Sequence, residues 1–449
     1  MNPLRMLLKN PWSAVGALLL LAGALSAVLV QYAQPGWWDA HRREGYTLTE
    51  AEVEALYPQV PDAENAALDY LRAANRVTHF ADGETAFQEN LPVAGGAELP
   101  EPNAPIPPQM ARSIREYAKR NERALDWACR GAAKTRVRFP VDVVNAPMDV
   151  TEHLSQVREL ARLLYVDALR YALNNQPSHA ADALMAMCAL SDALSREPLL
   201  ISQLVRVALA GITADAIEQT VNRVALPPEA LRKLEQRLDA PDFQTFDPMH
   251  AAVRNEFRWG VAWAEGQFAD EQGNAGSHWL AFRLLHLSGW TVFNETLKDR
   301  GMKVVLAAGE MPPHQAIGAM QELDYNDIRA TVAGLLLNAL PRLYEGQVRC
   351  IAIASLARMG LAVERYSRAH GGFPESLDPI TPAFIEAVPA DPYTGEPLRY
   401  KRTDKGCVVF SAGPNGQYEG GQARPDGSRY RQEGDIVFRL YAGTAGEPR

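Results

Sequence analysis

Histidine and tryptophan side chains concentrate between residues 250 and 314, and these residue types are the best suited in the chain to bind a metal or a ligand. The residues concerned are Trp259, Trp263, Trp279, Trp290, His250, His278, His286 and His314, with Glu256, Glu265 and Glu295 nearby. Imidazole nitrogens ligate metals and aromatic faces line ligand grooves. However, no His-Glu-x-x-His motif occurs and no two histidines are four residues apart, so packing between helices is the favoured interpretation. A ligand groove and a metal site remain alternatives.

Local catalytic motifs are missing from the sequence. It contains no Gly-x-Ser-x-Gly elbow, no phosphate-binding P-loop and no Gly-x-Gly-x-x-Gly fingerprint. We therefore assign no catalytic and no cofactor-binding residue. A catalytic triad can be assembled from residues far apart in sequence, so an enzyme with a dispersed site stays open as an alternative.

The four cysteines, Cys129, Cys188, Cys350 and Cys407, are isolated from one another. Without a Cys-x-x-Cys pair, a zinc site built on paired cysteines is excluded. Cys188 and Cys350 lie in apolar helical surroundings, which predicts buried thiols that act as small hydrophobic side chains. A disulfide remains open, with no connectivity indicated.

Composition and charge describe an ordinary globular chain. Its 449 residues allow two to four domains at about 100–200 residues each. Hydrophobic residues make up 47% and charged residues 22%, which is typical of folded proteins. The chain has 45 basic and 54 acidic residues, so its net charge is −9. This excess of negative charge disfavours a broad nucleic-acid-binding surface.

An apolar segment near the N-terminus predicts a membrane anchor. Residues 13–30 read SAVGALLLLAGALSAVLV without a charge, and as a helix they would span roughly 27 Å, close to the hydrocarbon thickness of a bilayer. Trp12 on one side and Tyr32, Trp37 and Trp38 on the other fit an interfacial aromatic belt. A cleaved signal peptide is the alternative, although its apolar region usually has only about 7–15 residues.

The flanking charges indicate how the anchor is oriented. Arg5 and Lys9 precede the segment closely, whereas Arg42 and Arg43 follow it at a distance, which favours a cytoplasmic N-terminus. We expect a single-pass protein of the bacterial inner membrane with most of the chain outside the cytoplasm. The apolar run 330–340 is too short to return through the bilayer, and we expect it to be a buried helix.

The body that follows is expected to be mainly α-helical. Capping boxes start at Thr47 and Thr49, a second helix is expected over 62–79, and a loop rich in Pro and Gly over 81–109. Apolar residues three and four apart over 148–174 predict an amphipathic helix. The prolines between Pro177 and Pro248 mark helix boundaries, so we expect an irregular bundle or short solenoid.

The last hundred residues predict a small α+β unit. A helix over 343–370 ends at Gly371-Gly372, and Asp391-Pro-Tyr-Thr-Gly395 has the composition of a tight turn. Strand-like segments follow at 398–402, 407–411 and 436–441. The expected arrangement is one long helix packed on a small antiparallel sheet.

These residues resemble the C-terminal domain of the type II secretion major pseudopilin, and they also resemble such tails on uncharacterised membrane-anchored bacterial proteins. The ordered set consists of Tyr366, Gly372-Phe373-Pro374, Leu377, Pro389-Ala-Asp391-Pro392, Tyr400, Ser411-Ala-Gly413-Pro-Asn415-Gly416, Gly420-Gly421 and Asp435-Ile436. About 100 of the 449 residues take part in the resemblance.

The resemblance implies a calcium site, because the final pseudopilin loop holds this ion. By position, Asn415 and Asp435 would be the side-chain ligands, with Glu419 or Asp426 as additions. Asn415 stands where the family usually has Asp, and the loop before Asp435 is longer than the family's loop. The alternative is a plain glycine turn capped by Asp435.

The sequence therefore predicts five regions. They are a cytoplasmic N-terminus (1–12), a transmembrane anchor (13–31), helices with a loop rich in Pro and Gly (32–107), an α-helical domain (108–341) and a pseudopilin-like α+β domain (342–445). The expected function is that of an envelope structural or interaction protein, with the bilayer and an unidentified protein as partners and no nucleic acid. A ligand-binding protein that uses residues 259–290 and a dispersed-site enzyme are the alternatives.

Overall fold

A computed structural model describes residues 49–144, 152–264, 303–321, 331–422 and 434–443. The predicted anchor, Asp426, Trp279, Trp290, His278 and His286 lie outside these residues. Trp259 and Trp263 belong to helix α13, but their side chains are not among those described. The architecture is mainly helical with a small antiparallel sheet near the C-terminus, as the sequence predicts.

Short helices form the first part of the body. They are α3 (Glu50–Leu56), α4 (Ala66–Ala74), η1 (Asp82–Glu84), α5 (Thr85–Glu89), α6 (Pro108–Arg120) and α7 (Glu122–Ala132). The capping box at Thr49 is confirmed, since Thr49 and Glu52 exchange hydrogen bonds at the start of α3. The helix expected over 62–79 is shorter, because the Asn65 side chain caps α4 by accepting from Ala67 N. The loop expected over 81–109 contains η1 and α5.

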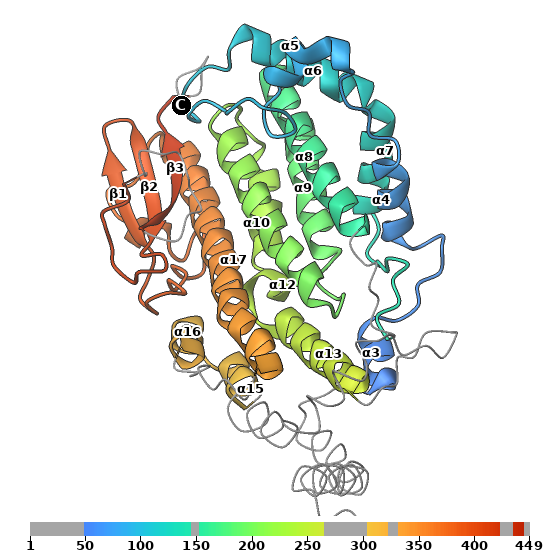
Figure 1. Ribbon diagram of the computed structural model, residues 1–449. Helices are drawn as coiled ribbons and strands as arrows, with labels where there is room; N and C mark the ends of the chain where they lie inside the picture. Colours follow the sequence, from blue (N-terminus) through green and yellow to red (C-terminus); the bar gives the residue numbers. More distant parts are fainter. Residues whose placement is uncertain (1–48, 145–151, 265–302, 322–330, 423–433, 444–449) are drawn as a thin grey trace, which may run out of the picture.

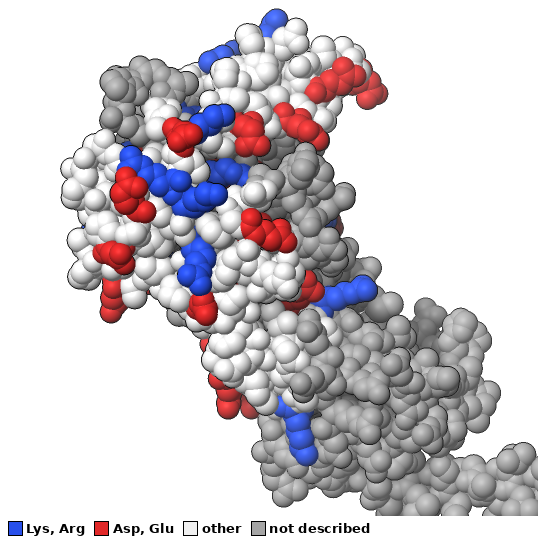
Figure 2. All heavy atoms as spheres, turned by 90° about the vertical axis from the view of Figure 1, so that its left-hand side faces the viewer, with Lys and Arg blue, Asp and Glu red and all other residues white. Residues whose placement is uncertain are grey.

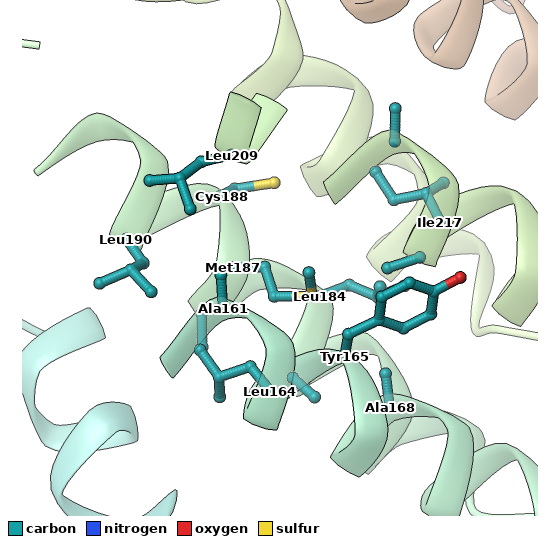
Figure 3. Close-up of a cluster of buried hydrophobic side chains, with 14 of the residues drawn as sticks. Ala161, Leu164, Tyr165, Ala168, Leu184, Met187, Cys188, Leu190, Leu209 and Ile217 are labelled. Atoms are coloured by element: carbon teal, nitrogen blue, oxygen red, sulfur yellow. The ribbon is translucent and has the colours of Figure 1, made fainter. Parts of the chain in front are cut away.

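The centre of the body is built from α8 (Glu152–Leu173), α9 (Pro177–Asp192) and α10 (Leu200–Val221). The predicted apolar face of α8 is confirmed, and its side chains interdigitate with those of α9 and α10. Figure 3 shows this cluster around Ala161, Leu164, Leu184, Met187 and Ile217. Alanines on α8 and α9 allow the two helices to approach closely, so the hairpin has a dense apolar interior.

Among the described residues, further helices follow between α10 and α17. They are α11 (Pro228–Leu238), α12 (Pro241–Gln244), α13 (Asp247–Ala264), α15 (Lys303–Glu310) and α16 (Pro313–Gln321). Several prolines occupy first turns, as expected from the missing N–H of this residue. A second apolar cluster joins α13, α15 and α16 around Phe246, Met249 and Tyr344.

Helix α17 (Thr331–His370) is 40 residues long and starts earlier than the sequence suggests. Pro341, which we took to precede the helix, lies inside it, so the expected domain boundary at residue 341 falls within α17. The glycine cap is confirmed: Gly371 has φ +74° and Gly372 N donates to Ser367 O over 3.0 Å. Figure 1 shows α17 between the helical body and the sheet.

The sheet consists of three antiparallel strands in the order β1-β2-β3. The strands are β1 (Arg399–Thr403), β2 (Gly406–Ser411) and β3 (Ile436–Tyr441), within one residue of the predicted segments. Val409 pairs with Tyr400 on one side and with Phe438 on the other, so β2 is the central strand. Phe438 packs against Gly360 of α17, where a larger residue would collide with its ring.

The sheet and the helical body share one apolar core. The same continuous cluster contains Leu164 of α8, Ile217 of α10, Leu356 of α17 and Phe438 of β3. In addition, the Asn222 side chain at the end of α10 bonds the backbone of β3, accepting from Tyr441 N at 2.9 Å and donating to Arg439 O at 2.8 Å. Asn222 thus satisfies the outer edge of β3 much as another strand would.

Two of the described helices are long and apolar enough, by length and composition, to cross a membrane. They are α10 and the part of α17 from Pro341 to His370. Within the protein, however, 56% and 83% of their most apolar windows are buried. Both helices therefore also fit the description of core helices, and they are weak evidence for a membrane span.

Candidate functional site

A buried carboxylate, that of Glu197 between α9 and α10, connects several elements of the body. Its side chain is fully buried. The Tyr57 hydroxyl donates to Oε2 over 3.1 Å, and His153 Nε2 lies 3.0 Å from Oε1. The Ser202 hydroxyl also donates to Oε1. Three side-chain partners from α3, α8 and α10 therefore meet at one carboxylate.

Tyr57 extends this network to a further segment. Its hydroxyl oxygen accepts a hydrogen bond from Phe139 N at 2.7 Å while its proton points to Glu197. The Arg138 guanidinium lies 4.6 Å from the centre of the tyrosine ring. Burial, and then the charge of Glu197, raise the pKa of Tyr57 well above its usual value, so the phenol stays protonated and remains a donor.

Backbone contacts hold the Glu197 turn in position. The Gln203 side chain donates to Leu194 O at 2.9 Å and to Glu197 O at 2.7 Å. Asn255 of α13 donates to Pro198 O and to Val143 O, at 2.8 and 3.1 Å. These bonds satisfy carbonyl groups that would otherwise be buried without partners. The Glu197 network therefore joins α3, the 139–143 segment, α8, α10 and α13.

The hydrogen bonds around Glu197 are better suited to holding helices together than to catalysis. Both carboxylate oxygens of Glu197 already have protein donors, and the phenol that contacts it is not poised to release its proton. Sequence inspection missed this site. Tyr57 lies 140 residues from Glu197, and His153 lies 44 residues away, so no local spacing reveals them. The available signal was an acidic residue between an arginine and a proline, followed by the apolar residues 199–201.

The described histidines of the aromatic-rich region are packing residues. His250 contacts the Tyr344 hydroxyl, which itself donates to Val305 O over 2.9 Å. Burial lowers the pKa of His250 to about 4, so the ring is neutral near pH 7. A side chain at Gly309 would collide with this ring, and a side chain at Gly395 would collide with the ring of His314. These contacts agree with the packing interpretation for the part of the region that the structure describes.

Glu256 is the described acidic residue of that region, and its carboxylate also points into the protein. It accepts a hydrogen bond from Leu200 N over 3.4 Å, and burial raises the pKa of its carboxyl. Across the described ranges, no group of three or more His, Cys, Asp or Glu side chains is placed to hold a metal ion. None of the four cysteines forms a disulfide in the described structure, and Cys188 and Cys350 are buried as predicted.

Asp391 organises the predicted turn in the C-terminal unit and is fully buried. Its Oδ1 accepts from Tyr393 N at 2.9 Å and from the Ser411 hydroxyl at 2.8 Å, and its Oδ2 accepts from Ala412 N at 2.8 Å. Gly395, with φ +77°, closes the turn by donating to Asp391 O. The Asp-Pro-Tyr-Thr-Gly prediction is confirmed, and the same carboxylate also fixes the end of β2.

The expected calcium ligands Asn415 and Asp435 lie in one loop, where both side chains form hydrogen bonds with other groups of the protein. Asp435 accepts from Glu419 N at 3.0 Å with both oxygens and from Gly421 N at 2.7 Å. The Asn415 amide donates to Glu419 Oε1 at 2.9 Å, and its oxygen accepts from Gln417 N. These bonds from Glu419 N and Gly421 N make Asp435 the cap of a glycine turn, which is the arrangement that the alternative interpretation describes. The calcium site stays a prediction.

Charges of both signs alternate on the outer side of the sheet. Figure 2 shows basic and acidic side chains next to each other on this side of the molecule. Ion pairs join Arg399 to Glu396 and Arg402 to Glu375. Charged residues on an exposed edge strand discourage pairing with another strand, so β1 is protected against edge-to-edge association.

Comparison with family models, with curated proteins and with solved structures finds no match for this chain.

Proposed function

We propose that this chain is a membrane-anchored, extracytoplasmic structural or interaction protein of the bacterial envelope. In this proposal residues 13–30 hold it in the inner membrane. The helical body and the pseudopilin-like end then act by contacting a protein partner, in envelope or secretion-associated assembly.

The proposal rests on exposed apolar side chains at one end of the helical body. The large apolar side chains that are exposed among the described residues are Leu56, Ile201 and Leu204, each about 41% accessible. Leu56 belongs to α3, and the other two belong to the first turns of α10. A buried cluster of Val53, Tyr57 and Leu199 joins these same two elements. The exposed apolar residues therefore gather where the chain enters the body from the predicted anchor.

The hydrogen bonds of the Glu197 network also support the proposal, because they hold α3 in place. In a membrane-anchored protein, the first folded element after the anchor must stay attached to the rest of the body. Tyr57 of α3 is hydrogen-bonded to Glu197 and to Phe139 N, both fully buried. The long helix packed on a three-stranded sheet is consistent with the pseudopilin resemblance of the last hundred residues.

Fractionation of bacteria that express the full chain tests this proposal. We expect the protein in the inner-membrane fraction, resistant to extraction by alkaline carbonate. Protease added to spheroplasts should degrade the body, and a variant that lacks residues 1–31 should no longer sediment with membranes.

A matched control keeps the apolar length constant. Replacing Leu19 and Leu20 by arginine places two charges at the centre of the segment, at a cost of roughly 2.5–3.5 kcal/mol each, and should abolish insertion. Full-length protein that stays in the soluble fraction, or a body that is protected from protease in spheroplasts, would contradict the proposal.

A further inference from the structure

Three arginine side chains surround a single tryptophan on the surface formed by α4 and α7. The guanidinium carbons of Arg130, Arg72 and Arg76 lie 4.8, 5.3 and 5.7 Å from the centre of the Trp127 ring. Significant cation–π contacts occur about once per 70–80 residues in proteins, so three on one indole form a distinct local concentration. We call these four residues the Trp127 cluster.

The packing of α4 against α7 creates this cluster. Gly131 lies against the ring of Tyr70, and a β-carbon there would approach a ring atom to 2.7 Å, so the two helices come unusually close. Arg72 and Arg76 are four residues apart, near the end of α4, and reach across to Trp127. Arg130 reaches the same ring from the next turn of α7. The helices lie side by side at one edge of the molecule.

The positive charge of the Trp127 cluster is only partly balanced by the protein. Asp69 is nearly buried and is shared by Arg72 at 3.1 Å and Lys134 at 2.6 Å. Within the described residues, Arg76 and Arg130 form no salt bridge, and Arg76 donates instead to Arg72 O. Like charges held around one ring repel one another, so an external anion would stabilise the arrangement.

Two acidic residues of α7, Glu122 and Asp126, are exposed near the cluster. Within the described residues neither forms a salt bridge with Arg76 or Arg130. A guanidinium that stacks on an aromatic face keeps its N–H edge available for bidentate bonds to a carboxylate. The cluster therefore offers donor edges beside an apolar indole.

We propose that the Trp127 cluster is a docking site for an acidic peptide segment of a partner protein. Three arginines match two or three carboxylates, and the half-buried indole accommodates an apolar side chain between them. An anionic bilayer surface is usually recognised by four to eight clustered basic residues, and nucleic acids by a longer basic stripe. The compact cluster, in a chain of net charge −9, fits a short acidic segment better.

Fluorescence anisotropy with the full chain in detergent tests this site. The probe is a fluorescein-labelled octapeptide of alternating glutamate and leucine, and the control peptide has glutamine in place of glutamate. We expect the acidic peptide to bind and the neutral one not to bind. Arg76→Gln combined with Arg130→Gln should weaken binding by at least about tenfold, because the charge-assisted bonds of both guanidinium groups to the peptide carboxylates are lost.

Arg112→Gln is the matched control, because Arg112 also stacks on a ring, that of Phe87, and among the described residues no second guanidinium lies over this ring. This variant should bind the acidic peptide as the parent does. Equal binding of both peptides, or an equal loss in Arg112→Gln and in the double variant, would overturn the proposal. So would binding to phosphatidylglycerol vesicles that depends on Arg76 and Arg130 while the acidic peptide fails to bind. Unchanged melting of the double variant shows that the fold is intact.

Discussion

Two buried carboxylates, one in the helical body and one in the C-terminal unit, are satisfied in different ways. Glu197 is bonded by side chains that come from three separate helices. Asp391 is bonded by two backbone N–H groups and one hydroxyl, all from its own turn or the adjoining end of β2. Both side chains are fully buried. The first holds distant segments together, and the second shapes a local turn.

This difference shows what each kind of site does for the protein. A carboxylate with long-range side-chain donors positions elements whose sequence separation is large, so its loss affects the packing of the whole end of the body. A carboxylate with local backbone donors mainly fixes the conformation of its own loop. We therefore expect removal of Glu197 to have the larger and more widespread effect.

The largest effect is expected for Glu197→Ala. Removing the acceptor leaves three polar groups buried without their partner, which should lower the free energy of unfolding by about 3–5 kcal/mol. Urea denaturation followed by circular dichroism measures this loss. Glu197→Gln keeps one acceptor oxygen and should recover part of the stability. If Glu197→Ala costs less than Asp391→Ala, the contrast between the two carboxylates fails.

Asp391→Ala should cost about 2–3 kcal/mol, because two backbone donors and the Ser411 hydroxyl lose their acceptor. Hydrogen exchange should locate the effect in the 391–395 turn and in β2, with little change around α8. Asp391→Asn keeps an acceptor oxygen and serves as the matched control. Faster exchange throughout the helical body would show that the site is not local.

Because of His250, the stability of the helical body should depend on pH in a way that the stability of the sheet does not. Burial lowers its pKa to about 4, below the value of about 6.5 in the unfolded chain. The stability it contributes is therefore present above pH 6.5 and is lost as the pH falls toward 4, by about 1–3 kcal/mol. His250→Phe keeps a ring beside Phe246 and Tyr344, so its stability should fall less over this range. Parallel curves for parent and variant would contradict the assignment.

The smallest effect is expected from removing single hydroxyl groups. Tyr57→Phe removes a donor to Glu197 and the acceptor of Phe139 N, at about 1–2 kcal/mol. Tyr400→Phe in the sheet removes the hydroxyl that donates to Pro374 O, at about 0.5–1 kcal/mol. Thermal melting of the two variants side by side sharpens the comparison. A larger loss for Tyr400→Phe would reverse the expected order.

The parts of the fold that were predicted correctly are those in which the deciding interactions are local. The Asp391 turn, the Gly371 cap and the three strands follow from residues within a few positions of each other. Helix periodicity likewise located the buried face of α8. The mainly helical character and the small antiparallel sheet near the C-terminus could therefore be derived from sequence.

The parts that were missed depend on tertiary contacts. Glu197 gains its partners only when α3, α8 and α10 pack together. Helix α17 continues through Pro341 although proline usually interrupts a helix. For the expected calcium ligands, the pseudopilin resemblance named Asn415 and Asp435 by position. It did not show that backbone N–H groups would occupy the Asp435 carboxylate, because loop conformation decides that.

The position of α17 near the end of the chain has a consequence for biosynthesis. This helix covers apolar faces of α10 and α11 and also supports β3, yet it is made only after the first 330 residues. At about 5–20 residues per second, the ribosome needs roughly 10–30 s to proceed from the end of α10 to the end of α17. During that interval the nascent body lacks the helix that completes its core. We expect chaperones to hold the emerging chain until α17 has been synthesised.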